Sequence, residues 1–265
     1  MLMTQATPSK QAAPAPILDI KGVCKRFGGV VVADKIDLEI CGGQILGLIG
    51  PNGAGKTSLF NLISGVVAAD AGSIVLGGQS LLGLPLYRRA RIGVARTWQH
   101  MRLFGSLTVL ENMLVAPSHY PGESLLRLIL SPAAVRRAEA ETRERAHVIL
   151  KRMKLDALAD ANVNDITFGQ QKLVGLARAL MSNGPVLLLD EPMAGVEGVA
   201  YETMRDIVRE EAASGRAVCV VEHNVSFIRD LCNSAVFMAQ GRILERGDVA
   251  TLLESKVLAE LYFGH

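Results

Sequence analysis

The sequence predicts an α/β fold: a mixed, mostly parallel sheet with an antiparallel edge and an inserted helical subdomain. Short apolar runs, many bounded by Gly or Pro, alternate with longer amphipathic segments. Such runs are typical of strands that are covered on both faces, as in parallel α/β sheets. Between about residues 97 and 181 the strand signal almost disappears, which indicates a helical lobe inserted between two parts of one sheet.

The individual elements follow from hydrophobic periodicity. The predicted strands are Ile17–Val23, Ile36–Ile40, Gln44–Ile49, Ser73–Leu76, Ile92–Arg96, Val186–Leu189, Ala217–Val221 and Ala235–Met238. The predicted helices are Lys56–Ser64, Val135–Met153, Thr167–Met181, Val199–Ala213 and Val225–Cys232. We expect Val135–Met153 to be a solvated amphipathic helix, and Ser118–Pro132 to be a loop carrying one short helix.

Composition narrows the class of protein. The 265 residues carry a net charge of +2, which does not suggest a nucleic-acid partner. No stretch approaches the roughly 18 apolar residues of a spanning helix, so we expect a protein that lies against a membrane protein without crossing the bilayer. Residues 1–16 predict a disordered tail ahead of a folded domain over 17–265. The four scattered cysteines fit reduced thiols in a cytosol.

A glycine-rich loop joins the strand Gln44–Ile49 to the helix Lys56–Ser64. It fits G-x-x-x-x-G-K-[ST], and with the residue that follows it the predicted nucleotide site comprises Gly50, Pro51, Asn52, Gly53, Ala54, Gly55, Lys56, Thr57 and Ser58. Glycines let backbone N–H groups turn around phosphates, and the helix N-terminus adds a favourable dipole. Lys56 supplies positive charge for the β- and γ-phosphates, and Thr57 supplies a hydroxyl for Mg²⁺.

This loop predicts a P-loop NTPase core. A chance glycine-rich turn is disfavoured by the strand before it and the helix after it. A dinucleotide fold is disfavoured because the glycine order differs from G-x-G-x-x-G. The loop alone leaves kinases, GTPases and motor ATPases open.

Two carboxylates end the strand Val186–Leu189. A buried parallel strand delivers its last residues to the sheet edge where ligands of α/β folds bind. We expect Asp190 to hold Mg²⁺, directly or through water, and Glu191 to take a proton from the attacking water. Acidic residues at strand ends are common, so this prediction depends on the phosphate loop.

The segment Ile166-Thr-Phe-Gly-Gln170 opens a helix with a hydroxyl and a glycine, a second place for an anion. It resembles the L-S-G-G-Q signature of ABC-type ATPases and precedes the Asp190 strand as the family signature does. The other family landmarks follow the same order, and the likeness covers roughly Ile17 to Gly264. They are Phe27, similar to the aromatic that stacks on adenine; Gln99, similar to the Q-loop; Ala194–Glu197, similar to the D-loop; and His223, similar to the switch histidine.

The resemblance implies an ATPase that works as a head-to-tail dimer with MgATP between the chains. One chain would hold ATP on Lys56, Thr57 and Gln99, and its partner would supply Thr167, Gly169 and Gln170. Glu191, His223 and Lys56 would be catalytic; Thr57, Gln99 and Asp190 would hold Mg²⁺. The implied partners are transmembrane permease subunits, a second ATPase subunit of the same or a related kind and, indirectly, a substrate-binding protein. The implied location is peripheral, at the cytoplasmic face of the inner membrane.

The sequences of several short segments indicate one branch of this family. Arg96–Phe104, Leu107–Asn112, Phe168–Gln171, Glu222–Asn224 and Leu261–Gly264 are similar to the ATPases of branched-chain amino-acid importers. Urea importers and lipopolysaccharide exporters carry close relatives and stay open. In this family the segment that holds Met101, Leu103 and Phe104 shapes the groove for a permease helix; the alternative is that the three are core residues.

Three residues depart from the family pattern. Thr167 replaces the signature serine but keeps its hydroxyl, Phe168 replaces the first signature glycine, and Glu197 stands where Asp or Asn is usual. A non-hydrolysing regulatory subunit is therefore an alternative, opposed by the presence of Glu191 and His223. A soluble ABC ATPase that acts on nucleic acid or ribosomes is another. Such proteins usually carry two ATPase units or long coiled-coil insertions, and this chain has neither.

Overall fold

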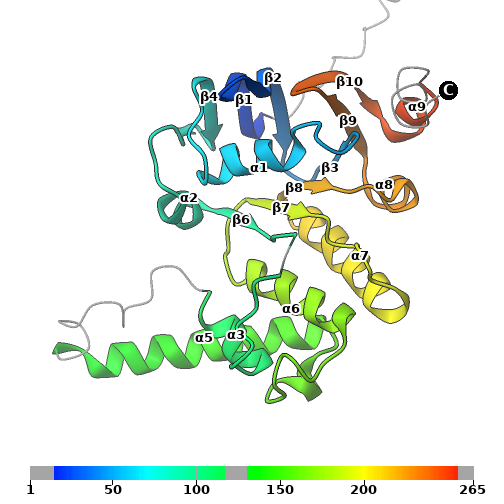
Figure 1. Ribbon diagram of the computed structural model, residues 1–265. Helices are drawn as coiled ribbons and strands as arrows, with labels where there is room; N and C mark the ends of the chain where they lie inside the picture. The colour runs from blue at the N-terminus through cyan, green and yellow to red at the C-terminus, as the bar shows by residue number, and fades with distance from the viewer. Residues whose placement is uncertain (1–14, 100, 117–129, 256–265) are drawn as a thin grey trace, which may run out of the picture.

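The computed structural model describes residues 15–99, 101–116 and 130–255, and its strands form two sheets (Figure 1). The smaller sheet is antiparallel and has the order β2-β1-β4-β5. Its strands are β1 (Pro16–Phe27), β2 (Val30–Cys41), β4 (Ala71–Leu76) and β5 (Gln79–Ser80). Pro16 therefore belongs to the fold, one residue ahead of the predicted start, whereas residues 1–14 of the predicted tail lie outside the described residues.

The larger sheet has the order β10-β9-β3-β8-β7-β6. Every strand pair in it is parallel except β9–β10, so the mixed, mostly parallel sheet with an antiparallel edge is confirmed. Its strands are β3 (Ile45–Ile49), β6 (Val94–Arg96), β7 (Val186–Asp190), β8 (Ala217–Val221), β9 (Ser234–Ala239) and β10 (Arg242–Asp248).

Each predicted helix is present, and most helix ends differ from the predicted ends by a few residues. The helices are α1 (Lys56–Ser64), α2 (Leu86–Ile92), α3 (Val109–Leu114), α5 (Pro132–Arg152), α6 (Phe168–Leu180), α7 (Gly198–Ala213), α8 (Val225–Leu231) and α9 (Val249–Leu253), with a 3₁₀ turn at Asp156–Leu158. The prediction of a strand from Ile92 is wrong at its start. Ile92 ends α2, and Gly93, at a φ of 122°, turns the chain into β6.

Alternation along the central strands builds a hydrophobic core on each face of the larger sheet. Leu46 and Leu48 of β3 pack with α1 and the antiparallel sheet. Ile45 and Ile49 pack on the other face, with α6, α7 and α8. Since both faces are covered, the strand residues form continuous apolar runs, which is why these strands were readable in the sequence.

Between β6 and β7, the regular secondary structure of the described residues is helical (Figure 1). Helices α3, α5 and α6 contact one another, and α6 also contacts α7 of the sheet layer. The predicted amphipathic helix is confirmed in α5, where Val135 of the predicted apolar face is buried near the start. The C-terminal half is the more deeply packed part. Ala146, Ile149 and Leu150 are buried there against the rest of the lobe. Residues 118–129 of the predicted loop lie outside the described part, and Pro132 begins α5.

Candidate functional site

The glycine-rich loop lies between β3 and α1, as the sequence predicts. Gly50 and Gly55 pack so closely that a Cβ would lie 2.0 Å from the carbonyl oxygen of Met238 and 2.4 Å from that of Val32, respectively. Gly53, by contrast, has a φ of 79° and open space where a Cβ would stand. Helix α1 has no side-chain cap at its N-terminus, so its first N–H groups are available to an anion.

Lys56 folds its side chain back into this loop. Its Nζ donates hydrogen bonds to the carbonyl oxygens of Gly50, at 2.7 Å, and Pro51, at 3.0 Å. Burial lowers the pKa of Lys56, and the charges of Glu191 and Asp190 act in the opposite direction. The amine therefore lies in the phosphate loop, where it feels the charges of the two carboxylates at the end of β7.

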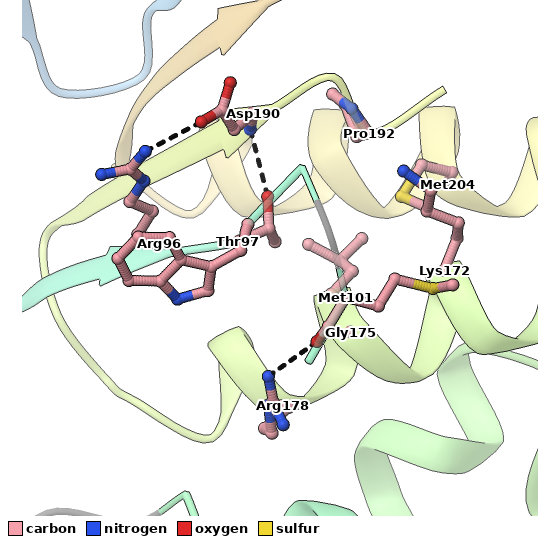
Figure 2. A pocket seen from close by; sticks show the side chains of 11 residues that line it. Arg96, Thr97, Met101, Lys172, Gly175, Arg178, Asp190, Pro192 and Met204 are labelled. Atoms are coloured by element: carbon pink, nitrogen blue, oxygen red, sulfur yellow. Dashed lines mark hydrogen bonds and ion pairs between the residues drawn. The ribbon is translucent and has the colours of Figure 1, made fainter. Parts of the chain in front are cut away.

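Asp190 is held by residues at the end of β6 (Figure 2). Its Oδ2 lies 2.8 Å from a guanidinium nitrogen of Arg96, and its backbone N–H donates to Oγ1 of Thr97 at 3.1 Å. Burial raises the pKa of Asp190, while the hydrogen bond and charge of Arg96 lower it. The second carboxylate oxygen, Oδ1, is buried and has no hydrogen-bond partner among the described residues. It is the oxygen of Asp190 that a cation would satisfy.

Arg96 is itself fixed by several neighbours. Its Nη2 binds Asp190, and its Nη1 donates to Oδ1 of Asn61 at 2.8 Å and to Oγ of Ser64 at 3.0 Å, both on α1. Its guanidinium lies 4.3 Å from the ring centroid of Trp98. This side chain therefore connects the phosphate-loop helix to the end of β7.

Three of the predicted site residues meet at Glu191. Nε2 of Gln99 donates to Oε2 of Glu191 at 2.8 Å, and Nε2 of His223 lies 3.0 Å from Oε1. The backbone of Glu191 has a φ of 48°, a left-handed conformation that is rare for residues other than glycine. The Glu191 carboxylate is thus held by two side chains from the loops that follow the neighbouring strands β6 and β8.

The signature segment is placed differently. The Thr167 hydroxyl accepts the N–H of Gln170 and the Gln170 side chain accepts the N–H of Thr167, a capping box at the start of α6. Thr167 and Phe168 are exposed, and no hydrogen bond or ion pair joins 167–170 to 50–58 within the described residues. Phe27 is 51% exposed at the end of β1, with Nζ of Lys25 5.3 Å from its ring centroid.

These features fit a nucleoside triphosphate with a divalent cation. The loop offers an open cradle at Gly53 and free N–H groups at α1, Lys56 supplies positive charge, and Asp190 has one unpartnered buried oxygen. Thr57 is exposed in the first turn of α1. A bound cation would neutralise phosphate charge.

The sequence pattern of the ABC transporter family matches residues 33–194. This chain belongs to the ABC transporter ATP-binding family. It is 32% identical over 250 residues to the high-affinity branched-chain amino acid transport ATP-binding protein LivG of Escherichia coli K12, covering 94% of this chain and 98% of that protein. Its identity to BraF of Pseudomonas aeruginosa, a protein with the same description, is also 32%, with the same coverage. The lipopolysaccharide export ATP-binding protein LptB of Escherichia coli K12 is 32% identical over 248 residues, 93% of this chain and 97% of LptB.

Solved structures agree. A nucleotide-free ATP-binding cassette from an ABC transporter superposes with a TM-score of 0.82 at 30% identity, covering 94% of this chain and all of the other. The ADP conformation of another cassette gives 0.80 at 28% identity, covering 94% and 99%. The chain is thus a nucleotide-binding ABC cassette and an ATPase, with the P-loop NTPase fold predicted from the sequence.

The sequence does not indicate a role for several residues of the site, among them Arg96, Lys172 and Glu222. Lys172, on α6, donates from Nζ to the backbone oxygen of Glu191 at 3.1 Å. Glu222 is 3% exposed directly after β8. The available signal was a charged residue next to a buried strand end, beside a residue already singled out: Arg96 in the Gln99 segment, Glu222 before His223.

The segment before α3 divides between core and surface. Leu103 packs against the core, and Met101 lines the small pocket below Asp190 in Figure 2. Phe104 is 51% exposed and lines a groove with Leu86, Trp98 and Val115. Leu103 is thus partly buried against the core, whereas the permease contact of this segment stays a prediction.

Proposed function

We propose that this chain is the motor subunit of an ABC-type importer, coupling MgATP binding and hydrolysis in a head-to-tail dimer to uptake of branched-chain amino acids. The observation that carries the catalytic part is the convergence of Gln99 and His223 on Glu191. This constellation lies at the sheet edge that also holds Asp190 and the charge of Lys56.

The chemistry assigned to these groups is hydrolysis of the terminal phosphoanhydride. Glu191 accepts a proton from water as the water oxygen attacks the γ-phosphorus, the bond to the bridging oxygen breaks, and ADP keeps its electron pair. Lys56 and His223 stabilise charge on the γ-phosphate. Asp190, Thr57 and Gln99 hold Mg²⁺, Phe27 stacks on adenine, and Gly50–Ser58 surround the phosphates.

The placement of the signature segment supports the proposed dimer. Within the described part of the chain, Thr167, Gly169 and Gln170 make no hydrogen bond to the phosphate loop, and they lie at the partly exposed start of α6. We assign them to the ATP of a partner chain, identical or related, so that hydrolysis requires closure of the pair.

The groove at Phe104 is the proposed docking site for a permease. It carries exposed apolar side chains, Leu86, Phe104 and Val115, at the edge of the helical lobe. Residues from about 97 to 181 would act as a subdomain that transmits dimer closure to the permease helix. Among the described residues, no helix has the length and apolar character needed to cross a bilayer. We place the chain peripherally at the cytoplasmic face of the inner membrane, with a substrate-binding protein acting on the permease from the other side.

The solute is inferred from relatives. LivG and BraF are described as branched-chain amino acid transport proteins, and both align over nearly all of this chain. LptB, described as part of a lipopolysaccharide export system, has the same identity, so export is the second candidate.

The deciding experiment is affinity purification of tagged Glu191→Gln from its native membranes with ATP present, followed by mass spectrometry. Two polytopic permease chains with a sister ATPase, and labelled-leucine uptake that disappears in Glu191→Gln cells, would support the proposal. Lipopolysaccharide-export partners would transfer the motor to the second candidate. Recovery of ribosomes or DNA-bound proteins would refute the transport role.

A further inference from the structure

Glu222 joins two loops of the site through its two carboxylate oxygens. Oε1 accepts the backbone N–H of Met193 at 2.7 Å. Oε2 accepts the N–H of His223 at 3.1 Å and, at a longer 3.5 Å, that of Asn224. Met193 stands two residues after Glu191, and His223 directly follows Glu222, so one carboxylate connects the turn after β7 to the loop after β8.

This bridge closes a ring around the catalytic groups. The N–H of Glu191 donates to the carbonyl of Val221 at 2.9 Å, and the side chain of His223 reaches Oε1 of Glu191 at 3.0 Å. The Glu222–Met193 bond is the third connection, and it acts on the C-terminal side of Glu191. Without it, the turn after Glu191 would be tied to β8 only on its N-terminal side and through an exposed imidazole.

The hydrogen bond between Glu222 and Met193 lies next to a strained backbone position. Glu191 adopts a φ of 48°, and a non-glycine residue stays in this region only where its surroundings fix it. The N–H of Ala194 reaches the Glu191 carbonyl only at 3.4 Å, so the turn is weakly closed by its own backbone. The 2.7 Å bond to Glu222 is the shorter restraint on this turn.

Glu222 is not explained by an ordinary ion pair. The nearby Lys172 uses its Nζ on the carbonyl of Glu191, and no ion pair of Glu222 is present in the described part of the chain. Burial raises the pKa of Glu222, and its bonds from the N–H groups of Met193, Asn224 and His223 lower it. These partners are donors, the arrangement that an ionised carboxylate satisfies.

We propose that Glu222 is a positioning residue that fixes Glu191 and His223 in their catalytic geometry and ties both to the start of the D-loop segment 194–197. Met193 immediately precedes that segment, so a displacement of 194–197 would reach the His223 loop through Glu222. The proposal rests on the roles proposed above for Glu191 and His223.

The central test is Glu222→Gln, which keeps size and shape but turns one acceptor oxygen into a donor facing an N–H group. We expect kcat for ATP hydrolysis to fall about tenfold or more while KM for ATP changes less than about twofold. Amide exchange of the peptide that contains residues 190–198 should accelerate. The matched control is Glu211→Gln, also a buried glutamate, 7% exposed and paired with Arg152 and Arg216 away from the site. It should leave kcat and this exchange unchanged.

Two further measurements keep the proposal testable if Glu222→Gln folds poorly. In the unmodified protein, the amide proton of Met193 should be protected from exchange, and exchange at the unprotected rate would refute the bridge. In the double variant Glu222→Gln/His223→Ala, the loss of turnover should be smaller than the product of the two single losses, because part of the effect of Glu222 acts through His223. Multiplying losses would refute positioning. If His223→Ala and Glu191→Gln retain turnover, the proposed roles fail, whereas Met193 protection still reports on the bridge alone.

Discussion

The side chains to which we assign the chemistry lie around the end of β7, and they occupy two different environments. Asp190 is buried, paired with Arg96 and left with one unpartnered oxygen. Glu191, one residue later, is part-exposed and held by Gln99 and His223. A left-handed turn at Glu191 separates these environments, so adjacent carboxylates suit different tasks.

Glu191→Gln tests the role of the carboxylate as a base. The amide keeps its size and an acceptor for Gln99 but cannot take a proton, so ATP should still bind while phosphate release falls about 100-fold or more. Equilibrium nucleotide binding and steady-state phosphate release measure the two effects. Glu245→Gln on β10, away from the site, should leave both unchanged. Near-normal turnover of Glu191→Gln would remove Glu191 from the mechanism.

Arg96→Met tests the buried pair. Losing the guanidinium leaves the buried charge of Asp190 uncompensated, so the free energy of unfolding should fall by about 3–5 kcal/mol. Arg242→Met removes an ion pair with Asp34 in which the arginine side chain is 65% exposed, and should cost about 1 kcal/mol or less. Denaturant unfolding of both variants measures the difference. Equal losses would mean that Arg96 has no special structural role.

The N-terminal caps of two helices allow a role in stability to be distinguished from a role in ATP hydrolysis. Helices α3 and α6 both begin with a capping box. The hydroxyl of the N-cap threonine accepts a backbone N–H, and the side chain of a Glu or Gln three residues later accepts the N–H of the threonine. Thr108→Ala and Thr167→Ala should each lower the free energy of unfolding by about 1 kcal/mol. Thr167→Ala alone should also slow ATP hydrolysis, because we assign its hydroxyl to the partner chain's nucleotide. Equal activity in the two variants would reduce Thr167 to a cap.

The elements also show where sequence reasoning succeeds. Strands β3, β7 and β8 are buried on both faces, so their apolar runs were visible, and the G-x-x-x-x-G-K-T pattern fixed the start of α1. Strand β10 was missed because its residues alternate between exposed and half-buried and include charged side chains at the sheet edge. Helix α2 was missed because it is short and carries Arg88, Arg89 and Arg91.

The sequence predicts which residues form the candidate site, but it does not predict the individual contacts between them. Motif spacing indicated Lys56, Asp190, Glu191 and His223, and the strand order then brings β7 and β8 together. The bonds of Arg96 to Asp190 and of Glu222 to Met193 depend on side-chain directions and on the turn at Glu191. No periodicity in the sequence encodes them.

At the scale of the whole molecule, the single chain holds one half of each proposed catalytic site. Lys56 opens α1 and Glu191 directly follows β7, while Thr167 and Gly169 stand at the start of α6 in the lobe. Among the described residues, these two make no hydrogen bond to the phosphate loop. The central claim is therefore that ATP joins two chains. It implies that wild-type turnover per chain rises with protein concentration in the dilute range.

The most direct measurement is sedimentation velocity of Glu191→Gln with saturating ATP, compared with Glu191→Gln/Thr167→Asp, in which a carboxylate that can still cap α6 would face the partner's phosphates. The account predicts a nucleotide-dependent dimer for the first protein and a monomer for the second, with both binding ATP. A Glu191→Gln protein that binds ATP and stays monomeric at every concentration, while the wild type hydrolyses ATP at a concentration-independent rate per chain, would contradict it.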